Sequence, residues 1–170
     1  AADLANYPRT EHQDAEKLAG LNVDVIYVPD GSQIYPDGYA TNVSVSGVSD
    51  VLEGEFRAGH FDGVATVVAK LFLQTGAHRA YFGQKDFQQL MVVKRMARDL
   101  DIPIEVVGCP TVRETSGLAM SSRNMRLSAD GLVKAGALHP ILTRLAAEVS
   151  AGGHFADLKK QAEAEILAAG

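Results

Sequence analysis

The feature that most constrains the fold is an alternation of two apolar periods along the chain. Short runs in which every second residue is apolar alternate with longer runs in which apolar residues recur about every 3.6 positions. The first period is typical of strands and the second of helices. A strand, a helix and a second strand within so few residues indicate parallel neighbours joined by a right-handed crossover. We therefore predict an α/β fold built on a parallel sheet.

The pattern places the expected elements of the first region. Strands are predicted at residues 23–28, at 79–82 as a short buried strand, and at 102–107, and helices at 10–20, 61–76 and 86–100. Residues 31–57 are rich in Gly, Pro, Asp and Ser, which favours an irregular segment with short β-like pieces at 42–45 and 48–52. The two long helices are expected to bury these residues: Val64, Val67, Val68, Leu71 and Phe72, and then Phe87, Leu90, Val93, Ala97 and Leu100.

The pattern changes after Pro110. A polar, turn-rich segment continues to Asn124, and helical sequence follows from Ser128 with a break near Pro140 and a last helix at residues 155–168. We therefore expect two domains. Residues 1–111 would form a partial Rossmann-like nucleotide-binding domain with a parallel sheet, and residues 112–170 the start of a smaller C-terminal domain.

Composition narrows the classes of partner. With 16 Lys and Arg against 21 Asp and Glu, the net charge of −5 provides no global cationic field, so nucleic acid and a membrane surface are not expected partners. No run approaches the roughly 18 apolar residues of a membrane span. The single cysteine, Cys109, has no internal disulfide partner, which fits a reducing, cytoplasmic compartment.

The first candidate site is the loop and helix start at residues 83–89. In an open parallel sheet, ligands bind beyond the carboxyl ends of the strands. Gly83 allows close approach of backbone, the following helix start offers unpaired N–H groups, and Lys85 adds a full positive charge, which together suit a phosphate or nucleotide. The alternative is structural, because Asp86 followed by Gln89 is also a capping-box pattern and Lys85 could be a solvated loop residue.

The second candidate is the serine–arginine loop. Ser121, Ser122 and Arg123 place two hydroxyls and a permanently charged guanidinium together, which suits the oxygens of a triphosphate and charge that develops in nucleotidyl transfer. The alternative is a turn that caps the next helix. The presence of two loops suited to anion binding in one chain favours a phosphate site. The five histidines lack the spacing of a metal site, and Cys109 is expected to be a buried thiol rather than a nucleophile.

Consecutive blocks of the chain carry a family resemblance. They are residues 7–10, 35–38, 52–54, 59–61, 63–72, 80–90, 110–114 and 117–124, which include Gly83-Gln-Lys-Asp-Phe-Gln-Gln89 and Met120-Ser-Ser-Arg123. Through them the chain resembles the pantothenate synthetase family, the AMP-forming pantoate–β-alanine ligases. The resemblance implies a two-step reaction: ATP and pantoate give pantoyl adenylate and pyrophosphate, and then the amine of β-alanine displaces AMP. Mg²⁺ would accompany the ATP.

The resemblance also implies roles for individual residues. Lys85, Ser121 and Arg123 would be catalytic, and Gln89 would bind pantoate. The ATP-binding residues would be Gly83, Gln84, Lys85, Asp86, Val112, Met120, Ser121, Ser122 and Arg123. Catalysis would consist mainly of positioning and electrostatics, because an adenylate needs no protein nucleophile.

One part of the family pattern does not occur in these 170 residues. The family carries an earlier loop with a methionine and two spaced histidines, which supplies the catalytic histidine. We therefore expect the chain to be a fragment that is weakly active or inactive alone, and, from the family, to form a homodimer. The alternatives are another adenylyl-transferring enzyme of the same superfamily and a non-catalytic binding or dimerisation module.

Overall fold

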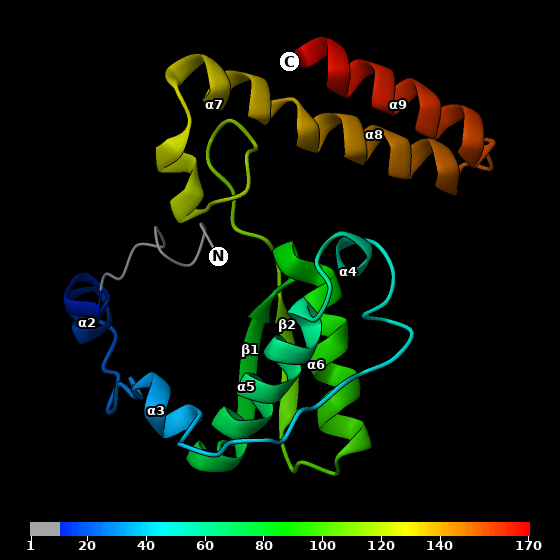
Figure 1. Cartoon of the computed structure of the whole chain (residues 1–170). Coiled ribbons are helices and arrows are strands. Elements are labelled where there is room, and N and C mark those ends of the chain that lie inside the picture. Colours follow the sequence, from blue (N-terminus) through cyan, green and yellow to red (C-terminus); the bar gives the residue numbers. More distant parts are fainter. Residues whose placement is uncertain (1–10) are drawn as a thin grey trace. The chain divides into compact units, whose positions relative to one another are not determined.

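The computed structural model describes residues 11–170 (Figure 1). The resemblance block at residues 7–10 and the first residue of the helix predicted at 10–20 lie outside this range; the rest of that helix is confirmed as α2 (Glu11–Ala19). The chain divides into two compact units. The first unit comprises Ala1–Phe82 and Asp86–Gly108, and the second unit comprises Gly83–Lys85 and Cys109–Gly170.

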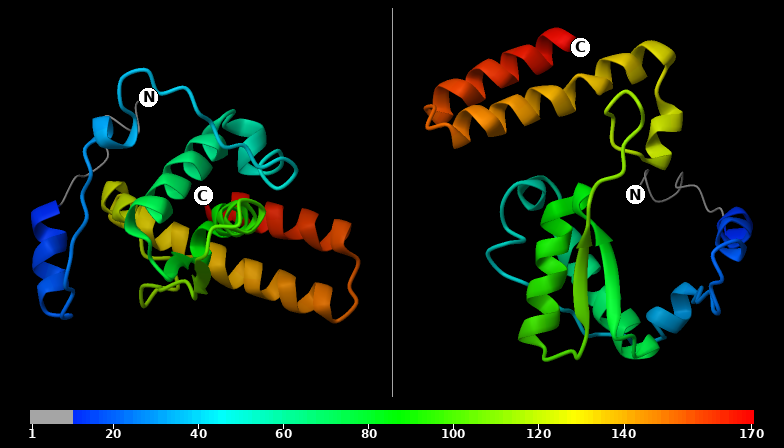
Figure 2. Two further views of the ribbon diagram at one scale, coloured as in Figure 1. Left: turned by 90° about the horizontal axis from the view of Figure 1, so that it is seen from below. Right: turned by 180° about the vertical axis from the view of Figure 1, so that it is seen from behind.

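The structure contains a two-stranded parallel sheet, which confirms the predicted α/β class. Strands β1 (Arg79–Gly83) and β2 (Glu105–Cys109) are connected through the short 3-10 helix η1 (Gln84–Asp86) and α6 (Phe87–Asp99). The prediction of a buried strand at 79–82 is wrong in one respect. Ala80 and Phe82 pack against the core, but Tyr81, whose side chain points to the opposite face, is 65% exposed. Among the described residues, helices cover one face of this sheet (Figure 2).

Two helices pack against each other and supply most of the core. Helix α5 (His60–Thr75) ends at Gly76, whose φ of 57° is the left-handed conformation that glycine adopts without strain. Both predicted helices are confirmed, and their buried faces agree with the predicted ones in part, at Phe72, Leu90, Val93 and Ala97. The buried residues are Phe61, Ala65, Thr66, Ala69 and Phe72 in α5, and Leu90, Val92, Val93, Met96 and Ala97 in α6.

Small residues belong to the buried set that the pattern did not predict. Ala65 and Ala69 are almost completely buried, in a cluster that also contains Val92 and Met96 of α6. The predicted Val64 and Val68 are half-buried and pack against this cluster, and Phe87 and Leu100, at the ends of α6, are exposed. Apolar periodicity therefore predicted both helices and part of the buried face of each.

The predicted strands before residue 60 are wrong. Residues 23–28 form no strand, and Val25 is 76% exposed. The pieces at 42–45 and 48–52 are irregular as well, and the only regular elements between residues 31 and 57 are the short helices α3 (Gly31–Ile34) and α4 (Glu53–Phe56). A strand needs a neighbour for its backbone groups, and among residues 11–170 none pairs with these segments.

Side chains of the long helices hold this irregular segment in place. Val43 N donates to Thr66 Oγ1 at 2.9 Å, and Val45 joins the core. Gln88 Nε2 donates to the carbonyls of Val48 and Val51 at 2.9 and 2.6 Å, and its Oε1 accepts from Glu53 N at 3.2 Å. These side-chain bonds satisfy backbone groups that a neighbouring strand would otherwise satisfy.

The second unit is a short hairpin followed by helices. The helical elements are η2 (Ser122–Arg126), α7 (Ala129–Gly136), α8 (Leu138–Ser150) and α9 (Phe155–Ala169). The predicted break is confirmed at Ala137. Pro140 lies in the first turn of α8, where its missing amide costs no intrahelical bond. No helix of the described residues has the length and apolarity that crossing a membrane requires.

Helices α8 and α9 run side by side in opposite directions (Figures 1 and 2). Arg144 on α8 joins them: Nη1 donates to the carboxylate of Glu148 at 3.0 and 3.1 Å, and Nη2 to Glu165 on α9 at 2.6 Å. Hydrogen bonds to Glu148 and then to Glu165 raise the pKa of Arg144 above its usual value. Both carboxylates therefore favour the charged guanidinium.

Candidate functional site

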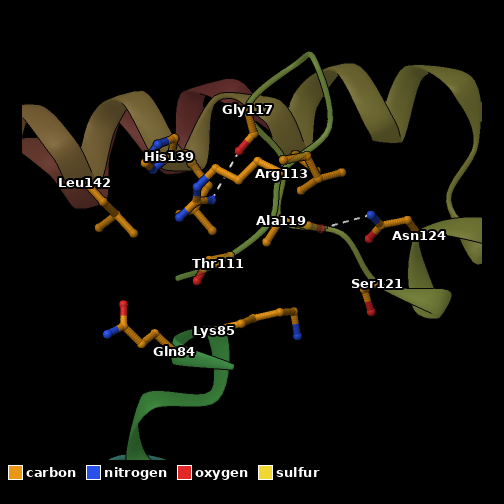
Figure 3. Close-up of a pocket in the computed structure, with 13 residues that line it drawn as sticks. Gln84, Lys85, Thr111, Arg113, Gly117, Ala119, Ser121, Asn124, His139 and Leu142 are labelled. Atoms are coloured by element: carbon orange, nitrogen blue, oxygen red, sulfur yellow. Dashed lines mark hydrogen bonds between the residues drawn. The ribbon is translucent and has the colours of Figure 1, made fainter. Parts of the chain in front are cut away.

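The second unit contains a cavity of about 470 Å³ (Figure 3). Its walls come from Gly83–Lys85, from the hairpin after β2, from the start of η2 and from helices α7 and α8. The lining residues are Gln84, Lys85, Thr111, Arg113, Gly117, Leu118, Ala119, Ser121, Asn124, Ala135, Leu138, His139 and Leu142.

The charge of this lining has one sign. Lys85 and Arg113 are cationic, His139 adds a basic imidazole, and the described residues that line the pocket include no Asp or Glu. Thr111, Ser121 and the side-chain amides of Gln84 and Asn124 add neutral groups that donate hydrogen bonds. A cavity with cations, neutral donors and no carboxylate is suited to an anion that carries several oxygens.

Backbone hydrogen bonds fix the hairpin that forms one wall. Met120 N donates to Val112 O at 3.0 Å, and Glu114 N donates to Leu118 O at 2.8 Å. Gly117 takes a φ of 86° at the turn, a conformation that favours glycine. Arg113 Nη1 donates to Gly117 O at 3.1 Å, so the guanidinium is attached to its own hairpin (Figure 3).

The entry to η2 is held by two further side chains. Asn124 Nδ2 donates to Ala119 O at 3.0 Å, which ties the 3-10 helix to the hairpin. Ser121 precedes η2 in an extended conformation, and its Oγ accepts from Arg123 N at 3.2 Å. The capping alternative for the serine–arginine loop is therefore observed. Ser121 also lines the pocket, so the cap and the proposed ligand role concern the same hydroxyl.

The structure brings together some of the residues predicted from sequence. Gln84, Lys85 and Ser121 line the pocket. Val112 and Met120 lie on the hairpin and are 67% and 51% exposed, and Ser122 and Arg123 begin η2; none of these four is among the described residues that line the pocket. Gly83 ends β1. The roles of all these residues in binding ATP stay predictions.

Asp86 and Gln89 belong to the first unit. Asp86 is the N-cap residue of α6 but makes no side-chain hydrogen bond that caps the helix, so the capping box that the sequence offered as an alternative is not formed. Gln89 is half-buried in the first turn of α6. Their predicted roles, in binding the nucleotide and pantoate respectively, stay predictions.

Sequence reasoning assigned no role to Arg113 or His139, which both line the pocket. Arg113 stands inside the block at residues 110–114, but no spacing rule connects it with Lys85. His139 lies on α8, with Nδ1 3.3 Å from Thr143 Oγ1. Only the folded second unit brings these side chains to the cavity of Lys85.

The fold and the pocket together define an α/β protein with a cavity in its second unit whose lining carries cations and, among the described residues, no carboxylate. The family model described as Pantoate-beta-alanine ligase matches residues 1–170, and the chain therefore belongs to this family. The pantothenate synthetase of Ruegeria pomeroyi is 68% identical over 168 residues, which is 99% of this chain and 59% of that protein. The pantothenate synthetase of Roseobacter denitrificans is 61% identical over 170 residues, 100% of this chain and 60% of that protein.

Solved structures agree with this assignment. The crystal structure of pantothenate synthetase from Thermus thermophilus has a TM-score of 0.90 at 47% identity and covers 96% of this chain and 59% of that chain. The pantoate-beta-alanine ligase from Francisella tularensis, complexed with beta-gamma ATP and beta-alanine, has a TM-score of 0.77 at 39% identity, covering 84% of this chain and 55% of that chain. The chain thus spans about three fifths of the length of the curated relatives it matches.

Proposed function

We propose that this chain supplies part of a site where ATP activates pantoate and β-alanine then takes the pantoyl group. The observation that carries the proposal is the cationic pocket with Lys85 and Ser121 in its lining, in a chain that belongs to the pantoate–β-alanine ligase family. The Francisella tularensis relative was solved with beta-gamma ATP and beta-alanine, which supports ATP and β-alanine as ligands here.

The proposed chemistry has two steps. The carboxylate of pantoate attacks the α-phosphorus of ATP, the bond to the β-phosphate oxygen breaks, and pyrophosphate leaves. The amine of β-alanine then attacks the acyl carbon, and AMP leaves with the electron pair of the acyl–oxygen bond. Lys85 would neutralise charge at the phosphates, and Ser121, Ser122 and Arg123 would hold their oxygens. Positioning would supply much of the rate, since no covalent enzyme intermediate is required.

The remaining assignments follow the family resemblance. Gln89 would bind pantoate, since an amide both donates and accepts hydrogen bonds. Gly83, Gln84, Asp86, Val112 and Met120 would bind the nucleotide. Mg²⁺ would arrive on ATP: the pocket lining offers amide and hydroxyl oxygens but, among the described residues, no carboxylate. This donor set fits a magnesium ion held mainly by phosphate and water oxygens.

We further propose a cytoplasmic homodimer. Large exposed apolar side chains on the first unit, among them Phe56 at 86% and Val25 at 76%, support self-association, because their burial against a second copy would be favourable. Light scattering of the purified chain tests this proposal directly. A mass of twice the chain mass of 18.1 kDa supports it, and a clean monomer contradicts it.

Binding is the primary measurement for the nucleotide, because the chain spans about three fifths of its relatives' length. We expect calorimetry to detect MgATP binding, and Lys85→Met to weaken it about tenfold by removing a charge from the pocket. Lys159→Met, on the exposed face of α9, is the matched control and should leave the affinity unchanged. Failure of the unmodified chain to bind MgATP at millimolar concentration would contradict the proposal.

Turnover is the second measurement. Pyrophosphate release is measured with pantoate, with β-alanine and with a carboxylate that lacks the pantoate hydroxyls. Release that depends on pantoate supports the proposed reaction. Release that is equal with any carboxylate favours another adenylyl-transferring enzyme, and tight anion binding without preference for ATP favours a non-catalytic binding module.

A further inference from the structure

Arg113 lies across the pocket from Lys85. Figure 3 shows Gln84 and Lys85 on one side of the cavity and Arg113 with His139 on the other, with Thr111 between them. Both cations line the same cavity of about 470 Å³. Two positive groups on opposite walls are suited to an extended anion with charge at both ends, more than to a single phosphate or carboxylate.

The Arg113 side chain is held in place by a hydrogen bond to a neutral backbone carbonyl. Nη1 donates to the carbonyl of Gly117, and an isolated bridge between Arg113 and Ala119 fixes the backbone. Within residues 11–170, no carboxylate pairs with Arg113, and the neighbouring Glu114 does not line the pocket. Carboxylates do bind Arg79, Arg98 and Arg144. Arg113 is therefore positioned while its charge stays uncompensated by an acidic side chain.

A guanidinium in this state is suited to phosphate. It has five N–H donors in a rigid plane, and the bond to Gly117 uses one Nη1 donor. Because part of the side chain is already ordered, less rotamer entropy remains to be lost when an anion binds. Arg113 is exposed, so its guanidinium is accessible to a ligand that enters the pocket.

We propose that Arg113 is a second cationic binding residue for the polyphosphate of the nucleotide, and that it discriminates a triphosphate from a monophosphate. This inference rests on the proposed function, since it assigns the pocket to the phosphates of ATP. Lys85 contacts one end of the polyphosphate and Arg113 the other. A nucleoside monophosphate reaches only one of the two cations and gains little from the second.

The experiment measures the affinity of the 170-residue chain for sodium tripolyphosphate, MgATP and AMP by calorimetry. Arg113→Gln removes the charge but keeps a side-chain amide that can donate to Gly117 O. Arg113→Lys keeps the charge without the planar donors. Arg79→Gln, which removes a cation from the first unit, is the matched control.

We expect Arg113→Gln to weaken binding of tripolyphosphate and MgATP about tenfold, and Arg113→Lys about threefold. Binding of AMP should change less than about twofold in both, and Arg79→Gln should leave all three affinities unchanged. Wild-type affinity for tripolyphosphate in Arg113→Gln overturns the inference. Equal loss in Arg113→Gln and Arg113→Lys, with faster amide exchange in the hairpin of both, also overturns it, because Arg113 then acts only on folding.

The outcomes separate this inference from the proposed function. If Lys85→Met weakens MgATP binding and Arg113→Gln does not, the inference fails and the proposed function stands. If tripolyphosphate binding depends on Arg113 but the wild-type chain does not bind MgATP, the proposed function fails and the polyphosphate site stands. A wild-type chain that binds neither tripolyphosphate nor MgATP overturns both.

Discussion

At the scale of single residues, Ser121 combines a structural and a proposed binding role. Its Oγ caps η2, as the Oγ of Ser128 caps α7 by accepting from Gly131 N at 3.0 Å. Either serine to alanine change should lower the free energy of unfolding by about 1 kcal/mol, the usual value of an N-cap. Only Ser121→Ala should also weaken MgATP binding, because only Ser121 lines the pocket. Equal MgATP affinity in the two variants would argue against a ligand role for Ser121.

Leu52 carries backbone strain. Its φ of 52° and ψ of −118° belong to a region that glycine adopts readily and leucine does not, and its side chain is 69% exposed, so little burial is lost when it is removed. Leu52→Gly should therefore raise the free energy of unfolding by about 1 kcal/mol, after the entropy cost of glycine in the unfolded chain. Leu52→Ala is the control, and denaturant unfolding should show no gain for it because its Cβ keeps the strain.

The candidate site was partly predictable at this scale. Gln84, Lys85 and Ser121 stand in local patterns, a glycine-led helix start and a serine pair, whose residue types alone indicate anion binding. Arg113 and His139 carry no such pattern, because their role depends on hairpin register and on the packing of α8. The capping function of Ser121 was one of two alternatives that sequence left open, and only the Oγ–Arg123 N distance of 3.2 Å establishes it.

At the scale of elements, two adjacent glutamines on α6 have different roles: Gln88 stabilises the fold, and Gln89 is proposed to bind pantoate. Gln88 bonds both peptide groups that flank the strained Leu52, through Val51 O and Glu53 N, and also Val48 O. Gln88→Ala should lower the free energy of unfolding by about 2 kcal/mol, because three hydrogen bonds are lost. Gln89→Ala should change it by less than about 0.5 kcal/mol and instead weaken binding of pantoate. A reversed result in urea unfolding would contradict both assignments.

The link between α8 and α9 gives another prediction at this scale. Arg144→Met should lower the melting temperature, because it removes the bond to Glu165 that joins the helices and the bond to Glu148 within α8. Lys159→Met breaks a single exposed pair with Glu163, at 3.6 Å within one helix, and should have a smaller effect. The difference should shrink at high salt, which screens the charges of Arg144. Thermal melts of both variants at low and high salt measure it.

The elements that sequence predicted correctly are those whose pattern is local. Helices α5 and α6 follow from apolar periodicity, and Gly76 predicts the end of α5. The strand predicted at 23–28 has the β-branched composition of a strand, but a strand depends on a partner that composition does not specify. The buried faces were predicted only in part for a similar reason: Leu90, Val93 and Ala97 are buried as expected, but the burial of small residues such as Ala65 depends on what packs against the helix.

At the scale of the whole molecule, the two units differ in how much core they contain. All the buried hydrophobic residues of the described chain lie in the first unit except Ala162. Backbone amides of α5 and α6 should therefore exchange with deuterium more slowly than those of α7, α8 and α9. MgATP should slow exchange in residues 111–124 by occupying the pocket. Mass spectrometry of exchange, with and without MgATP, checks both statements, and uniform protection across the chain would contradict the first.

The division of the chain has a consequence for how the pocket can be inherited. Gly83–Lys85 belongs to the second unit, although the sequence on either side of it belongs to the first, so the chain passes between the units three times. The residues that line the cavity are therefore encoded by two separate stretches of the gene. A segment that encodes Cys109–Gly170 carries the hairpin and the helices but neither Gln84 nor Lys85. Recombination that moved only this segment would leave part of the pocket behind. The complete pocket is inherited only together with the segment that joins β1 to α6.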